Sequence, residues 1–353
     1  MGTIPNLPGI TSRIIATPRL SIHALESGPA DGEVVLFIHG NASSSTFWEE
    51  TMLALPDGFR AIAPDLRGYG DTEDLLIDAT RGVGDWVDDL LSLIDTLNVT
   101  RLHVAGHSLG GTVVFGLVAA RPGAIASLTV VAPGSPYGFG GVRPDGTPCF
   151  PDGAGSGAGS VNPEFARRMG EGDRSTDDPQ ASPRNVMNGF FWKPPFVPAR
   201  EEALLSGLLS EKMGGDRYPG DSVPSDNWPG TAPGSHGPVN AISATHSQGL
   251  AERFLAIETR PPVLWVRGDS DAIVSDASLF DLGNLGKLGF VPGYPGEDVF
   301  PPQPMVSQVR AVLDRYTEAG GSCREVVIAD AGHTPFIEKP EAFAEAFHPH
   351  IVG

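Results

Sequence analysis

Residues 106–111 read Gly-His-Ser-Leu-Gly-Gly, and they lie between the apolar segment 101–105 and the run Thr112–Ala120, which favours a helix. A serine between such glycines is typical of a sharp turn from a strand into a helix. Such a turn forces strained backbone angles on the serine and leaves neighbouring segments no room for a Cβ atom. It would present the Ser108 hydroxyl for nucleophilic attack. Because short glycine-rich stretches also form ordinary turns, the motif alone leaves both interpretations open.

The segments around this motif alternate between strand and helix patterns. Asp85–Ile94 spaces its apolar residues three and four apart, as in an amphipathic helix, and Thr112–Ala120 is apolar almost all round, as in a buried helix. The alternation predicts an α/β fold, with a mainly parallel sheet flanked by helices on both faces. Runs rich in apolar and β-branched residues predict strands at Ser12–Ala16, Leu20–Leu25, Glu33–His39, Arg60–Ala63, Leu102–Ala105, Ala126–Ala132, Pro262–Arg267 and Glu325–Ile328.

The alternation stops after residue 132 and resumes near residue 260. The segment between is dense in Gly, Pro, Ser and Asp and is interpreted as an insertion. Within it, Pro163–Met169 and Pro198–Lys212 favour helices, whereas 152–160 and Tyr218–Pro238 favour mobile loops. A second irregular stretch, Leu279–Pro304, is too long for an ordinary connection. It indicates a functional loop or an interface element, and so a candidate contact surface for a homodimer.

The chain is acidic: its 353 residues include 24 Lys and Arg against 43 Asp and Glu, for a net charge of −19. A charge of this sign repels nucleic-acid phosphates and anionic membrane surfaces. We therefore expect a neutral or apolar small-molecule substrate, and neither nucleic acid nor membrane as a partner. Solubility alone is the other explanation of this acidity.

The cysteines and the N-terminus bear on the cellular compartment. Cys149 and Cys323 are too few for a disulfide framework and too far apart in sequence for a metal site. Residues 1–10 lack the basic start and apolar stretch of a signal peptide, and no apolar run is long enough to span a bilayer. These features predict a soluble, cytoplasmic protein.

A serine hydroxyl is a poor nucleophile at neutral pH, so Ser108 needs a general base and a third group that orients this base. Of the nine histidines, His333 is the candidate base because it lies in the glycine-containing loop Asp330–Phe336, directly after the final predicted strand. Since the carboxyl ends of parallel strands share one edge of a sheet, this loop would lie beside Ser108. A lone loop histidine is otherwise more often only solvated.

Two aspartates in the loop Gly268–Val274, which follows another predicted strand, could orient the histidine. Asp271 is favoured because a residue three positions beyond the glycine can turn back toward His333, whereas Asp269 is placed to cap the turn. The carboxylate would hold the imidazole tautomer and stabilise the imidazolium without itself being protonated.

Attack on a carbonyl also needs hydrogen-bond donors where negative charge develops on the oxygen. One candidate is the backbone amide of Leu109, which follows the serine at a helix N-terminus. The other is the amide of Asn41, in the stretch 39–45 after the third predicted strand, where Gly40 lets the loop approach a substrate. The alternative interpretation of this stretch is an ordinary serine-rich turn.

Together these motifs resemble the α/β-hydrolase superfamily, in which nucleophile, acid and base follow one another along the chain as Ser108, Asp271 and His333 do. The resemblance covers most of the chain outside the insertion and includes Pro64–Asp71. It implies an α/β-hydrolase core formed by residues 1–132 and 260–353. It also implies that residues 133–259 are an inserted, mainly helical cap that supplies most of the substrate pocket.

On this resemblance, a substrate is expected to contact His39 and Gly40 in one turn, His107 in the other, and Phe191 and Trp192 in the cap. The two cap residues belong to a group of aromatic and methionine side chains that would line an apolar cavity. The core of the cap itself explains that group at least as well.

Residues 40–48 are also similar to the corresponding loop of haloalkane dehalogenases and related luciferases. In those enzymes the nucleophile is an aspartate, whereas this chain has Ser108, which leads to an acyl-enzyme instead of an alkyl ester. A dehalogenase or epoxide hydrolase activity is therefore disfavoured, and the loop supports the architecture more than the reaction.

The sequence thus predicts a serine hydrolase, without cofactor or metal, that cleaves a carboxylic ester or lactone through an acyl-enzyme on Ser108. Two alternatives stay open. The same residues would serve a carbon–carbon bond hydrolase or a cofactor-free perhydrolase, and the same scaffold without turnover would serve as a ligand-binding receptor.

Overall fold

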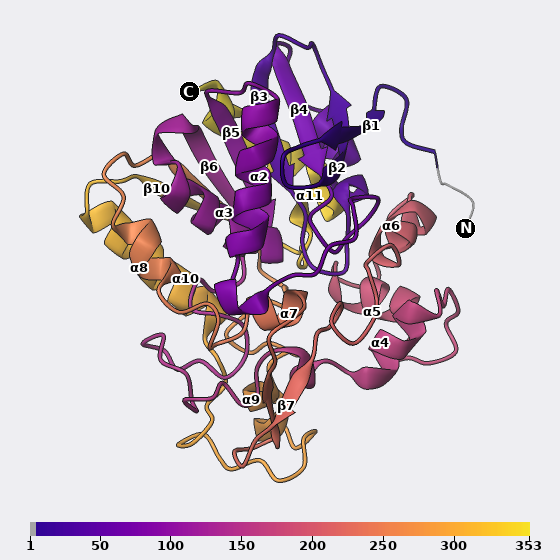
Figure 1. Cartoon of the computed structure of the whole chain (residues 1–353), viewed down its shortest axis with the longest axis vertical. Helices are drawn as coiled ribbons and strands as arrows, with labels where there is room; N and C mark the ends of the chain where they lie inside the picture. Colours follow the sequence, from indigo (N-terminus) through magenta and orange to yellow (C-terminus); the bar gives the residue numbers. More distant parts are fainter. Residues whose placement is uncertain (1–4) are drawn as a thin grey trace.

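The centre of the molecule is an eight-stranded sheet with the order β1-β2-β4-β3-β5-β6-β9-β10, in a computed structural model that describes residues 5–353 (Figure 1). β2 pairs antiparallel with both β1 and β4, and the other pairs are parallel. The predicted α/β fold with a mainly parallel sheet is confirmed. The strands are β1 Thr11–Ala16, β2 Ser21–Ser27, β3 Glu33–Ile38, β4 Phe59–Pro64, β5 Leu102–His107, β6 Ile125–Val131, β9 Val263–Gly268 and β10 Cys323–Ile328.

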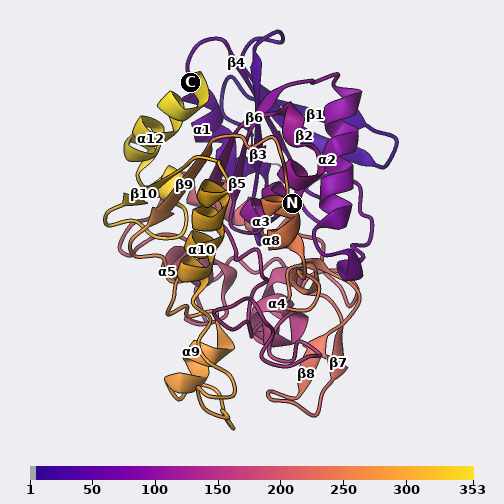
Figure 2. The same ribbon diagram turned by 90° about the vertical axis from the view of Figure 1, so that its left-hand side faces the viewer.

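Helices cover both faces of this sheet (Figures 1 and 2). Alternate residues of β3 divide between two hydrophobic cores: Leu36 joins the first and Phe37 the second, as the period of two in a strand requires. The first core lies under α2 (Gly84–Thr96), α3 (Leu109–Ala120), α8 (Leu250–Leu255) and α10 (Met305–Glu318). The second includes residues of α1 (Glu49–Leu53), α11 (Pro335–Glu338) and α12 (Pro340–Val352).

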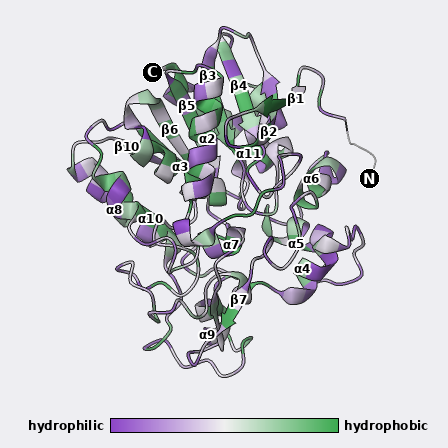
Figure 3. Ribbon diagram, viewed as in Figure 1, coloured by the Kyte–Doolittle hydropathy of each residue, from purple (hydrophilic) through white to green (hydrophobic). Residues whose placement is uncertain are grey.

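Helix α3 is buried over its first ten residues, as its apolar sequence predicts. It is in contact with α2 on one side and with α8 on another, and the Phe115 ring packs edge-on against Phe254 of α8 with 4.8 Å between centroids. In Figure 3 the strands and α3 are coloured mostly hydrophobic, whereas α2 carries both colours. A helix enclosed in this way has no solvent-facing side that would need polar residues.

The chain between β6 and β9 leaves the sheet and forms short elements, namely α4 (Pro163–Gly170), α5 (Pro183–Phe190), α6 (Glu201–Leu208), α7 (Pro238–Ala241), α8 and a hairpin of β7 (Ser222–Pro224) and β8 (Thr231–Pro233). The division of the chain at residues 133 and 259 stays a prediction. Within that segment, α8 is in contact with α3 and α10 and so flanks the sheet.

The stretch 152–160, predicted as a mobile loop, is largely buried. Residues 153–158 are buried, and the Ser156 hydroxyl donates to the Gly153 carbonyl at 2.7 Å. The same hydroxyl accepts the Ala244 amide at 3.3 Å, so Ser156 joins the glycine-rich stretch to the chain before α8. The second predicted loop, Tyr218–Pro238, contains the β7–β8 hairpin.

The sheet edge is joined to the loop after β4 by a histidine. His23 Nδ1 bonds Asp65 Oδ2 at 2.7 Å, and His23 Nε2 bonds the Ser12 hydroxyl of β1 at 2.8 Å.

The second irregular stretch, Leu279–Pro304, contains one short helix, α9 (Leu282–Lys287). In the part of the chain that the structure describes, no helix combines the length and apolar character needed to cross a membrane.

Candidate active site

Ser108 lies in the turn between β5, which ends at His107, and α3, which begins at Leu109. Its φ and ψ angles are 53° and −118°, a conformation that costs a residue with a side chain about 1–3 kcal/mol. The turn is held because the Ser108 amide donates to the Val131 carbonyl of β6 at 3.0 Å and the Gly134 amide donates to the Ser108 carbonyl at 3.1 Å. The strained angles at the predicted nucleophile are those of a sharp strand-to-helix turn.

The glycines beside this turn allow backbone segments to touch. A Cβ atom on Gly110 would lie 2.4 Å from the carbonyl oxygen of His39 and 2.5 Å from that of Ile38, and one on Gly106 would lie 2.4 Å from the Gly110 oxygen. Only glycine fits where helix α3 begins directly against β3 and β5.

His333 follows β10 and is 3% exposed. Its Nδ1 donates to Asp271 Oδ2 at 2.8 Å. The other carboxylate oxygen of Asp271 accepts the amides of Ile273 and Val274 at 2.8 and 3.0 Å, which fixes the orientation of the carboxylate. Asp269 instead accepts the amide of Asp330 at 2.9 Å, so the structure brings Asp271 and not Asp269 to the histidine.

The loop that carries the histidine is attached to the segment after α5. The Thr334 amide and hydroxyl both donate to the Phe191 carbonyl, at 2.7 and 2.6 Å. Glu338 accepts the Gly332 amide at 2.6 Å and the Lys193 amide at 3.2 Å. The position of the candidate base therefore depends on the inserted segment as well as on the sheet.

His107 supports the same loop from the side of the serine. Its Nε2 donates to the His333 carbonyl at 2.9 Å, and the two imidazole rings lie 4.7 Å apart. Burial, together with repulsion from His333, holds the pKa of His107 well below its ordinary value. His107 is therefore neutral and acts as a hydrogen-bond donor to the backbone.

The two predicted oxyanion donors, the amides of Leu109 and Asn41, both belong to residues at the cavity that Ser108 lines. Neither amide donates to an acceptor within residues 5–353, so both are available to a bound oxygen. The Asn41 side chain is held by the Tyr69 hydroxyl, which donates to Asn41 Oδ1 at 2.9 Å. The next residue, Ala42, has a φ of 47°, and this unusual angle turns the loop at the cavity wall.

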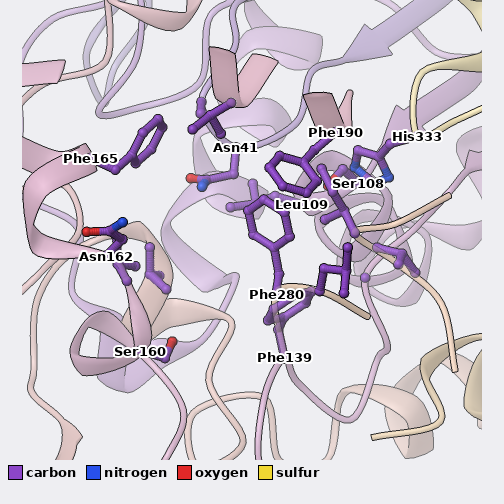
Figure 4. Close-up of a pocket in the computed structure, with 18 of the residues that line it drawn as sticks. Asn41, Ser108, Leu109, Phe139, Ser160, Asn162, Phe165, Phe190, Phe280 and His333 are labelled. Atoms are coloured by element: carbon purple, nitrogen blue, oxygen red, sulfur yellow. The ribbon is translucent and has the colours of Figure 1, made fainter. Parts of the chain in front are cut away.

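The cavity has a volume of about 680 Å3, and Figure 4 shows Ser108 and His333 together on one side of it, with Asn162 and Ser160 across from them. Its walls are mostly apolar. Within residues 5–353 the lining includes no Lys, Arg, Asp or Glu. A charged ligand would lose its hydration there without gaining a counter-ion from the lining side chains.

The residues predicted to contact a substrate divide into two groups. His107 and Phe191 line the cavity, whereas His39, Gly40 and Trp192 do not. His39 turns inward because its Nε2 accepts the amide of Leu66 at 3.0 Å. Trp192 is 1% exposed and belongs to the second hydrophobic core, which it shares with strands of the sheet. Gly40 lies behind Ser108, where a Cβ atom would come within 3.0 Å of the serine Cβ.

The model of the alpha/beta hydrolase family matches residues 35–346. This chain belongs to that family. The match includes the turn at Ser108, the loop of Asp271 and the loop of His333, so the sequence resemblance to the superfamily is confirmed.

Curated relatives of this alpha/beta hydrolase match it over shorter stretches. It is 35% identical over 115 residues to an epoxide hydrolase of Caballeronia sordidicola, covering 32% of this chain and 34% of that protein. It is 35% identical over 121 residues to a cis-3-alkyl-4-alkyloxetan-2-one decarboxylase of Xanthomonas campestris, covering 32% and 40%. The chain thus spans less than half the length of these relatives. The esterase RhEst1 from Rhodococcus sp. ECU1013 has a similar fold, with a TM-score of 0.60 and 20% identity over 98% of this chain and 99% of that one.

Sequence reasoning missed a polar group behind Asn41. Tyr218 lines the cavity, and the pKa values of Tyr69 and Tyr218 are raised by burial and by the nearby carboxyl of Glu211. Glu211 is itself buried, which raises its pKa well above the ordinary value, and neither of its oxygens has a well-aligned hydrogen-bond partner within the described residues. Tyr69 could have been noticed in the motif at Pro64–Asp71, whereas nothing in the local sequence marks Tyr218 or Glu211.

No group of three or more potential metal ligands lies together among residues 5–353. Both cysteines are free thiols, and burial raises the pKa of each to about 11.

Proposed function

We propose that this chain is a serine hydrolase that cleaves a neutral carboxylic ester or lactone, with Ser108 as nucleophile, His333 as base and Asp271 as the group that orients the base. The observation that carries the proposal is the 2.8 Å bond from His333 Nδ1 to Asp271 Oδ2, at the wall of the cavity that Ser108 also lines. With its proton on Nδ1, the imidazole has an unprotonated Nε2, which is the form that can accept a proton from a hydroxyl.

The steps follow from this arrangement. Ser108 Oγ bonds to the carbonyl carbon while its proton passes to His333 Nε2, and the amides of Leu109 and Asn41 donate to the resulting oxyanion. Collapse of this intermediate breaks the bond to the leaving oxygen, which takes the proton from Nε2. Water then attacks the acyl carbon and gives a proton to Nε2. The bond from this carbon to Ser108 Oγ breaks, Oγ takes the proton back from Nε2, and the acid is released.

The names of the two relatives bear differently on this proposal. An oxetan-2-one is a lactone, so the name of this relative supports a cyclic ester as the substrate class, whereas the decarboxylation that it names is a different reaction from hydrolysis. An epoxide, in contrast, would alkylate Ser108 to an ether that water does not hydrolyse, so the epoxide hydrolase activity of the other relative does not fit this nucleophile.

The test compares wild type with Ser108→Ala, using p-nitrophenyl acetate turnover and labelling by a fluorophosphonate probe. The substitution should lower kcat by about 10^3-fold to 10^6-fold and abolish labelling. Unchanged turnover in the variant would contradict the proposal, and absence of labelling in folded wild type would favour the receptor. Assays with a diketone, and with acetate plus peroxide, separate the carbon–carbon hydrolase and the perhydrolase.

A further inference from the structure

The cavity lining changes in character between its two ends. One end is formed by the stretch around α9, where Leu279, Phe280, Leu285 and Phe290 present apolar side chains. The other end is formed where α4 and the chain before α5 meet, with the polar residues of the segments 160–162 and 179–180. Helices α4 and α9 lie apart in both Figure 1 and Figure 2, so these ends are separate parts of the molecule.

At both ends of the cavity, some of the residues that line it are also exposed to solvent. Phe290 is 72% exposed and Leu279 is 42% exposed, although both line the cavity. Asn162 and Gln180 are also exposed at the polar end. Phe139, Phe190 and Phe280 lie in the middle of the cavity in Figure 4. A ligand held at Ser108 can therefore extend toward the surface in two directions.

The polar end offers uncharged hydrogen-bonding groups. Asn162 Oδ1 accepts the Glu164 amide at 3.0 Å, which leaves the side-chain NH2 group for a ligand. The Gln180 side chain has no hydrogen-bond partner within residues 5–353, since only its backbone amide is engaged, with Asp178. The NH2 group of Asn162 and the carboxamide of Gln180 can form hydrogen bonds with hydroxyl, ether or amide groups of a ligand. Neither side chain provides a charge for an ionic headgroup.

We propose, resting on the proposed function, that the substrate is a neutral amphiphilic ester. Its scissile carbonyl binds at Ser108, its alkyl or aryl chain extends past Phe280 to Phe290, and an uncharged polyol or amide group binds at Asn162 and Gln180. Each methylene buried along the apolar wall raises kcat/KM by roughly threefold to fourfold. Because the lining includes no charged side chain within residues 5–353, an ionic headgroup gains no counter-ion from it.

Four soluble esters test the proposal, each below its micelle concentration. Glyceryl octanoate and octyl glycerate are neutral amphiphiles with the chain on opposite sides of the ester bond. Ethyl octanoate lacks the polyol and glyceryl acetate lacks the chain. We expect kcat/KM for at least one amphiphile to exceed that of both matched esters by tenfold or more.

Two exposed variants separate the two ends. We define a preference as the ratio of two kcat/KM values. Gln180→Leu should lower the ratio of the amphiphile to ethyl octanoate by at least threefold. Phe290→Gln should lower the ratio of the amphiphile to glyceryl acetate by at least threefold. Each should leave the other preference unchanged. Leu288→Gln is the matched control, because Leu288 is 52% exposed in the same loop but does not line the cavity, and it should alter neither preference.

Absence of any amphiphile preference in wild type, or variants that change both preferences equally, would overturn the inference. Failure of the proposed function is distinguishable, since wild type would then neither hydrolyse p-nitrophenyl acetate nor be labelled at Ser108. Hydrolysis of p-nitrophenyl acetate without turnover of either amphiphile would overturn the inference alone.

Discussion

Asp271→Asn exchanges one carboxylate oxygen for an amide nitrogen and keeps the shape of the side chain. In the native site, Oδ1 accepts the amides of Ile273 and Val274, while Oδ2 accepts His333 Nδ1. The asparagine oxygen must take the place of Oδ1, because an NH2 group there would face two N–H donors. The NH2 group then faces His333 and donates to Nδ1.

This reversal moves the imidazole proton to Nε2, where it blocks transfer from Ser108. A wrong tautomer of this kind lowers kcat by about 10^4-fold in serine proteases, which corresponds to about 5.5 kcal/mol in the barrier. The backbone hydrogen bonds of Asp271 are retained, so the free energy of unfolding should change by no more than about 1.5 kcal/mol.

The assay measures kcat with p-nitrophenyl acetate and stability by urea unfolding. Asp269→Asn is the matched control, because Asp269 accepts the Asp330 amide and the Ser270 hydroxyl but does not contact His333. We expect the control to retain kcat within about threefold, as a lost surface hydrogen bond would allow. A kcat of Asp271→Asn within tenfold of wild type, or an equal loss in Asp269→Asn, would refute the assigned tautomer.

Two further predictions concern stability and pH. Burial raises the pKa of Glu211 above the unfolded value of 4.5, so the folded state loses about 1.4 kcal/mol per pH unit between the two pKa values. Glu211→Gln should therefore gain stability over wild type from pH 5 to pH 8 in urea unfolding, and a constant difference would contradict the neutral carboxyl. For His23, burial lowers the pKa, but the hydrogen bond and charge of Asp65 outweigh this and raise it above 6.5, while the partner's pKa falls below 3.8. The pair should thus stabilise the fold most between about pH 4 and 6.5, so the loss of unfolding free energy in His23→Gln should shrink as pH rises through the folded pKa of His23. Ser12→Ala is the control, because it keeps the pair. A loss that grows toward pH 8.5 would exclude this role.

The fold was predictable because its signals are local, and so was the place of Ser108 between a strand and a helix. The period of the apolar residues predicted the strands of the sheet and the helices at 85–94 and 112–120. The glycines at 106 and 110 mark a turn that leaves no room for Cβ atoms. The structure places Asp271 and not Asp269 against His333, as its position three residues beyond Gly268 predicts, while the roles of both residues in catalysis stay predictions. In contrast, the prediction that His39 and Trp192 contact a substrate was not met, since both are buried away from the cavity. The sequence did not reveal this, because the residues that they pack against or bond are not local.

The sequence by itself determined that Ser108 follows a strand and precedes a helix, because the apolar strand, the flanking glycines and the helical run are all local signals. Only the tertiary structure decided which segments surround this serine. Leu279, Phe280, Leu285 and Phe290 line the cavity, the Phe191 carbonyl accepts the Thr334 hydroxyl in the loop of His333, and Glu211 lies buried beside the tyrosines behind Asn41. The hydrogen bond between Thr334 and Phe191 joins residues 143 positions apart, and no local period encodes which distant backbone will satisfy a buried polar group.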